Sequence, residues 1–63
     1  MRYDSIEGMA VRKAPGEYLG HYRVIQAGRI VAEGDMPLTY RSESEARENA
    51  HKYGAAVADG LPP

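Results

Sequence analysis

The chain of 63 residues is long enough for one small domain, and its composition excludes several classes of protein. It contains no Cys, which excludes disulfides, thiolate zinc sites and a cysteine nucleophile. Eight Lys and Arg are balanced by nine Asp and Glu, so no bulk positive charge indicates a nucleic-acid ligand. No segment approaches the about 20 apolar residues that cross a bilayer, and the N-terminus turns acidic too early for a secretory signal. We therefore expect a cytoplasmic protein that has no membrane partner.

The chain before Ser42 has the alternating pattern of β-strands. A first strand is expected over residues 9–13. It is followed by Ala14-Pro15-Gly16-Glu17, in which Pro and Gly suit the two central positions of a tight turn. A second strand is expected over residues 18–25. Residues 1–8 show no clear period, so we expect a flexible N-terminus over 1–8, a single domain over 9–59 and a tail over 60–63.

The second turn decides which side chains share a face of the sheet, because a shift of one residue reverses every side chain. A three-residue loop, Gln26-Ala27-Gly28, pairs Val24 with Ile30, and the first hairpin pairs Met9 with Tyr22. The face to be covered then carries only apolar or aromatic residues: Met9, Val11, Tyr22, Val24, Ile30 and Ala32. A two-residue loop, Ala27-Gly28, mixes apolar with charged residues, so we prefer the longer loop.

A C-terminal helix is predicted to begin after Ser42. The sequence Ser42-Glu43-Ser44-Glu45 fits a capping box, in which the Ser hydroxyl accepts a hydrogen bond from the third helical residue. One face of the helix is marked by residues at helical spacing: Ala46, Ala50, Tyr53 and Val57. The predicted fold is α+β, an antiparallel meander of three or four strands with this helix packed on one face. Residues 38–40 are the candidate fourth strand, at an edge where Pro37 is tolerated.

Residues 28–34, followed by Ser42 to Ala46, resemble small bacterial single-domain proteins of unknown function, in which β-hairpins precede a Ser-x-x-Glu-Ala helix. This resemblance implies the fold and no chemistry. The same part of the chain is distantly similar to the second half of double-stranded-RNA-binding domains, which implies RNA binding as an alternative. That family needs cations at the helix start, whereas this chain has Glu43, Glu45 and Glu48.

Enzyme chemistry is not indicated. The chain has no Gly-rich phosphate loop, no arrangement of nucleophile, base and orienting group, and no metal-ligand spacing around His21 or His51. We therefore expect a non-enzymatic protein without catalytic, cofactor-binding or metal-binding residues. His21 is expected beside Glu33 on the uncovered face of the sheet, as an ordinary surface contact.

The uncovered face of the predicted sheet is the candidate interaction surface. Leu19, Ile25 and Val31 lie there among charged neighbours, and a domain of this size gains buried area by association. We expect an interaction or accessory module that forms a homodimer through this face or a strand edge, or that binds an unidentified protein. The alternative is RNA binding through three arginines that the predicted register places on this face: Arg12, Arg23 and Arg29.

Overall fold

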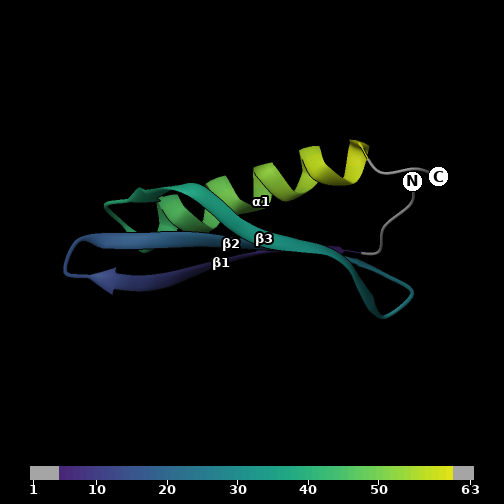
Figure 1. The fold of residues 1–63 in the computed structure, drawn as a ribbon, viewed down its shortest axis with the longest axis horizontal. Helices are drawn as coiled ribbons and strands as arrows, with labels where there is room; N and C mark the ends of the chain where they lie inside the picture. Colours follow the sequence, from purple (N-terminus) through teal and green to yellow (C-terminus); the bar gives the residue numbers. More distant parts are fainter. Residues whose placement is uncertain (1–4, 61–63) are drawn as a thin grey trace.

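A computed structural model describes residues 5–60 as a three-stranded antiparallel sheet and one helix (Figure 1). The strands β1 (Ser5–Ala14), β2 (Glu17–Gln26) and β3 (Arg29–Tyr40) lie in the order β1-β2-β3, and helix α1 (Glu43–Gly60) follows them. Figure 1 shows α1 lying along one face of the sheet, which we call the covered face; we call the opposite side the open face. The predicted α+β fold is confirmed, with three strands.

Three predicted boundaries differ from the structure. β1 begins at Ser5, so the prediction of a flexible segment is wrong for residues 5–8, while residues 1–4 lie outside the described part of the chain. Residues 38–40 are the end of β3 and not a fourth strand, because β3 continues through Pro37 at the sheet edge. α1 includes Gly60, which is predicted to lie in the tail; residues 61–63 lie outside the description.

The β1–β2 register differs by one residue from the predicted register. The hairpin closes with Ala14 opposite Glu17, and a register shift follows between Arg12 and Ala14. Beyond this shift Tyr22 pairs with Gly8, whereas the predicted partner is Met9. The prediction that Met9 and Val11 face the helix is therefore wrong, because an extra residue in one strand reverses the faces that follow. Both residues lie on the open face.

The β2–β3 hairpin turns through two residues, Ala27 (φ 52°) and Gly28 (φ 74°). Gln26 pairs with Arg29 across this turn, so the predicted three-residue loop is wrong. Two successive residues with positive φ are typical of a type I′ turn, whose twist matches that of the flanking strands. The two-residue turn therefore fits the twist of the strands. The predicted three-residue loop is preferred on the sequence alone because it separates apolar from charged side chains more completely on the two faces of the sheet.

A register shift in the pairing of β2 with β3 restores part of the predicted pattern. It lies between Val24 and Ile25 and adds one residue to β3, so that Val24 pairs with Ala32. Val24 and Ala32 consequently share the covered face, as predicted. Ile30 pairs with Ile25 and lies on the open face, so its predicted place under the helix is wrong.

The core between sheet and helix consists mainly of small residues. The buried apolar residues are Val24, Met36, Ala46, Ala50 and Ala58. Glycines bring the backbones close together: a Cβ on Gly8 would lie 2.8 Å from the backbone nitrogen of His51, and one on Gly20 would lie 2.8 Å from the carbonyl oxygen of Ala46. Close backbone approach, more than side-chain volume, therefore sets the distance between the helix and the sheet.

The predicted helix start is confirmed. The backbone N–H of Glu45 donates to Ser42 Oγ at 3.2 Å, which satisfies one of the amides that have no partner within the helix. The predicted helix face is right at Ala46 and Ala50, but the buried stripe continues through Gly54 and Ala58. Tyr53 is 42% exposed, and its ring lies 5.1 Å from that of Tyr22. In the described residues no helix is long and apolar enough to span a membrane.

Candidate functional site

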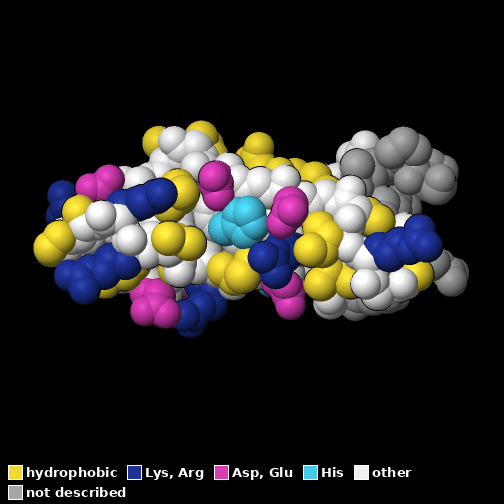
Figure 2. Space-filling model, turned by 60° about the horizontal axis from the view of Figure 1, so that its bottom comes forward, with side chains coloured by type: hydrophobic (Ala, Val, Ile, Leu, Met, Phe, Trp, Pro, Cys, Tyr) yellow, Lys and Arg dark blue, Asp and Glu magenta, His cyan; other side chains and the backbone are white. Residues whose placement is uncertain are grey.

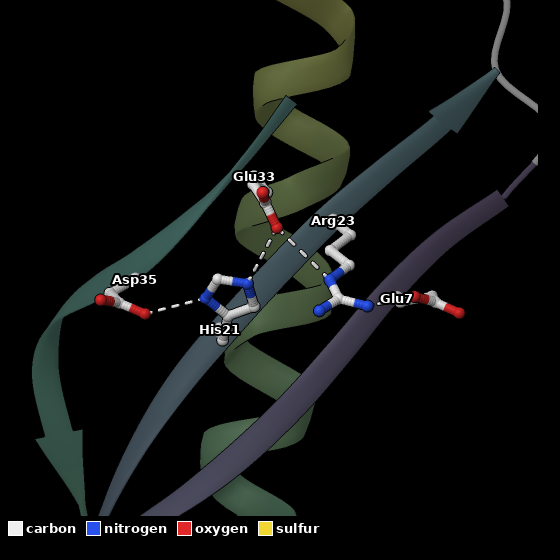
Figure 3. Close-up of polar contacts among 5 residues, drawn as sticks. All are labelled: Glu7, His21, Arg23, Glu33 and Asp35. Atoms are coloured by element: carbon white, nitrogen blue, oxygen red, sulfur yellow. Dashed lines mark hydrogen bonds and ion pairs between the residues drawn. The ribbon is translucent and has the colours of Figure 1, made fainter. Parts of the chain in front are cut away.

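The open face carries a row of charged and polar side chains across its middle, which we call the polar cluster (Figure 3). All three strands contribute to it: Glu7 from β1, His21 and Arg23 from β2, and Glu33 and Asp35 from β3. The backbone register brings these residues together, because Arg23 pairs with both Glu7 and Glu33, and His21 pairs with Asp35. Directly opposite side chains in an antiparallel sheet lie close enough to interact.

His21 contacts a carboxylate on each side of its ring. Nδ1 lies 2.8 Å from Asp35 Oδ1, and Nε2 lies 3.4 Å from Glu33 Oε2. The neutral imidazole has one N–H, so both contacts are hydrogen bonds from nitrogen to carboxylate only when both ring nitrogens carry protons. The contact with Glu33 agrees with the predicted position of His21. The closer contact with Asp35 was not predicted.

Arg23 lies between two carboxylates of neighbouring strands. Its Nε lies 3.4 Å from Glu33 Oε2, and its Nη1 lies 3.9 Å from Glu7 Oε1. These distances are those of ion pairs, and the buried Nε has no hydrogen-bond partner. Three carboxylates against one guanidinium give the polar cluster a formal charge of −2 when His21 is neutral (+1 − 3). The middle of the open face is therefore negative.

The described residues hold no group of three or more His, Cys, Asp or Glu that could bind a metal ion. They also enclose no pocket. Figure 2 shows a broad surface, on which the polar cluster is seen as cyan, magenta and dark blue side chains.

Apolar side chains lie at both ends of the polar cluster, as the yellow areas on either side of it in Figure 2 show. Towards the β1–β2 turn the register places three of them, which we call the first apolar group: Met9, Val11 and Leu19. Towards the β2–β3 turn lies the second apolar group: Ile25, Ile30 and Val31. Val11, Ile30 and Val31 are 47%, 50% and 40% exposed. The open face thus has a negative centre between two apolar ends.

The predicted interaction residues occupy both ends of this face. Leu19 and Ile25 lie on the open face, as predicted, but the polar cluster separates them. Val31 is the extra residue of β3 at the register shift between Val24 and Ile25, next to Ile30. The sequence interpretation missed Met9, Val11 and Ile30. The register shift between Arg12 and Ala14 brings Met9 and Val11 to this face, and the two-residue turn brings Ile30 to it.

The three arginines of the RNA-binding alternative do not share a face. Arg23 lies on the open face between carboxylates, whereas Arg12 pairs with Tyr18 and Arg29 pairs with Gln26, in rows whose side chains point the other way. The predicted grouping of Arg12, Arg23 and Arg29 is therefore wrong. The register shift between Arg12 and Ala14 reverses Arg12, and the two-residue turn reverses Arg29.

Comparisons with known proteins add no relative. The chain matches no protein-family model, no curated protein and no solved structure at the level taken as significant. The fold and the open face are accordingly interpreted from the residues themselves.

Proposed function

We propose that this chain is a small non-enzymatic protein-interaction module that binds a protein on its open sheet face. The observation that carries the proposal is the arrangement of this face, with a negative polar cluster between two exposed apolar groups. Interfaces commonly combine buried apolar contacts with charge complementarity, which fixes the orientation of the partner. The absence of a pocket among the described residues supports a binding role over a catalytic one.

The charge of the polar cluster indicates the chemistry of the partner. A Lys or Arg placed over the cluster would meet the carboxylates of Glu7, Glu33 and Asp35, only one of which Arg23 can neutralise. Apolar side chains on either side of that cation would cover the two apolar groups. We therefore propose a partner segment or surface that carries a central cation between apolar residues.

A second copy of the chain is a poorer occupant of this face. Face-to-face packing of two open faces would place both polar clusters in one interface, with a formal charge of −2 from each when His21 is neutral. Burying charged groups costs several kcal/mol per ion unless each one is well paired. RNA is disfavoured by the same charge, because the negative centre would repel phosphates.

Selection from a display library of random peptides against the full chain tests this proposal. We expect the enriched peptides to carry Lys or Arg between apolar residues. We expect Glu33→Lys to weaken their binding about tenfold or more, since it reverses one charge of the cluster. Val31→Asp, which changes the second apolar group, should weaken binding to a similar extent.

Glu48→Lys is the matched control, because it makes the same charge change on the exposed side of α1. It should leave peptide binding unchanged. Circular dichroism establishes that each variant is folded before its binding is measured. Failure to enrich peptides, or equal binding to Glu33→Lys and Glu48→Lys, would contradict the proposal.

A further inference from the structure

We infer that the outer edge of β1 pairs with the β1 edge of a second copy, so that two chains form one continuous six-stranded antiparallel sheet. This inference concerns a strand edge and does not depend on the proposed use of the open face. β1 is ten residues long and lies at the side of the sheet, and no described strand pairs with its outer side. Its outward backbone groups can therefore receive another strand.

The two edges of the sheet differ in their suitability for such pairing. β3, the opposite edge, contains Pro37 and has two register shifts along its length. Proline and bulges are features that prevent an edge strand from pairing. β1 contains no proline, and its register shift lies near its end, between Arg12 and Ala14. β1 is therefore the edge on which a second strand can extend the sheet.

Only some registers keep the faces of the two sheets aligned. In β1 the odd-numbered residues from Glu7 to Val11 lie on the open face, and Gly8 lies on the covered face. The two copies of β1 would be related by a two-fold axis perpendicular to the sheet. Odd-numbered residues lie opposite odd-numbered residues only when this axis lies at a residue, which then faces its own copy, and not between two residues. The axis can pass through Gly8, Met9, Ala10 or Val11.

An axis through Ala10 gives the best match of side chains. Met9 then lies opposite Val11 of the second copy, and Glu7 lies opposite the register shift that contains Lys13, each pairing occurring twice. Oppositely charged and apolar cross-strand pairs both stabilise a sheet. An axis through Gly8 or Met9 instead places Glu7 opposite an apolar residue, and an axis through Val11 places Lys13 opposite Met9.

The position of α1 favours the same register. Ala10 pairs with Gly20, at which a Cβ would lie 2.8 Å from the carbonyl oxygen of Ala46, near the start of α1. Further along the helix, a Cβ on Gly54 would lie 2.8 Å from Ile6 Cγ2. α1 thus begins over Ala10 and runs towards Ile6. A two-fold axis at Ala10 directs the two helices away from each other, whereas an axis at Gly8 would bring them side by side.

Sedimentation equilibrium of charge-reversed chains tests this register. We expect the unaltered chain to dimerise reversibly, and Glu7→Lys and Lys13→Glu each to weaken dimerisation about tenfold, because each places two pairs of like charges in contact. An equimolar mixture of the two variants should form a heterodimer about as stable as the original dimer, since opposite charges would again face each other at both cross-strand pairs. Glu48→Lys should leave dimerisation unchanged.

A chain that stays monomeric at the highest soluble concentration would overturn the inference. If the Glu7→Lys and Lys13→Glu chains fail to associate when mixed, the register is wrong, because the two altered side chains would then not face each other. Val31→Asp distinguishes this edge from the open face, and we expect it to leave the dimer intact. Dissociation by Val31→Asp would show that the open face holds the dimer, and would contradict both the edge pairing and the proposal that this face is kept for an unlike protein.

Discussion

Gly8 lies where β1 packs tightly against α1, and Gly8→Ala should destabilise the fold strongly. A Cβ at this position would lie 2.8 Å from the backbone nitrogen of His51, which is 0.6 Å short of the 3.4 Å at which ordinary contact begins, and closer still to the carbonyl oxygen of Arg47. Both are backbone atoms, so no side-chain rotation removes the overlap. The helix must move away from the sheet or the strand must bend.

The expected loss follows from two opposing effects. Overpacking costs about 1–3 kcal/mol, and a clash with backbone belongs at the upper end of that range. Replacing Gly by Ala in a strand returns about 0.5–1 kcal/mol of conformational entropy. The net loss is about 2 kcal/mol, a large share of the about 3–9 kcal/mol that a domain of this length has in total. It corresponds to a decrease in Tm of about 8–16 °C.

Urea denaturation followed by circular dichroism measures this loss of unfolding free energy. Gly60→Ala is the control, because a Cβ there has no atom within 4 Å and should change stability by less than about 0.5 kcal/mol. Gly54→Ala should cost less than Gly8→Ala, since its nearest neighbour is the end of the Ile6 side chain and Ala favours the helix by about 1 kcal/mol. Equal stability of Gly8→Ala and Gly60→Ala would refute the close packing described here.

Three further changes test other parts of the structure. Ser42→Ala removes the oxygen that accepts from the Glu45 amide and should lower the unfolding free energy by about 1 kcal/mol; the same urea titration checks this, and an unchanged midpoint would exclude the cap. Val24→Ala removes two methyl groups from the one large side chain that is fully buried among the described residues and should cost about 2 kcal/mol, as read from the thermal midpoint. A gel-shift titration with duplex RNA should show no salt-sensitive binding, because the open face has a negative centre.

Local signals in the sequence predicted the elements of the fold well. The capping box placed the helix start at Ser42, where the structure has the expected side-chain hydrogen bond. Pro15 and Gly16 predicted the first turn, and Gly16 has the expected positive φ of 70°. Each of these features depends on a few consecutive residues and on backbone preferences that those residues carry anywhere.

The assignment of faces was less predictable, because it depends on single-residue shifts. The shift between Arg12 and Ala14 moved Met9 and Val11 to the open face, whereas the errors in the second hairpin cancelled for Val24 and Ala32. A bulge adds one residue to a strand, and the alternation of residues does not encode its position. Gly8 and Gly20 are the better indicators of the covered face, since a glycine inside a strand can mark a close backbone approach.

The candidate surface was predictable only in part for the same reason. Leu19, Ile25 and His21 all belong to β2, whose alternation was interpreted correctly, so their common face was predicted. Asp35 joins them because it pairs with His21 across β2 and β3, a pairing that the sequence interpretation did not assign. The negative centre of the open face therefore emerged only from the structure.

The most direct test of the central claim, that the open face binds protein, is a methyl NMR titration of the full chain with a selected peptide. We predict that the methyl signals of Leu19, Ile25 and Val31 shift on binding. The signals of Val24, which is buried on the covered face, should shift much less. Shifts confined to Val24 and to methyl groups of α1 would contradict the claim, because the peptide would then bind on the helix side.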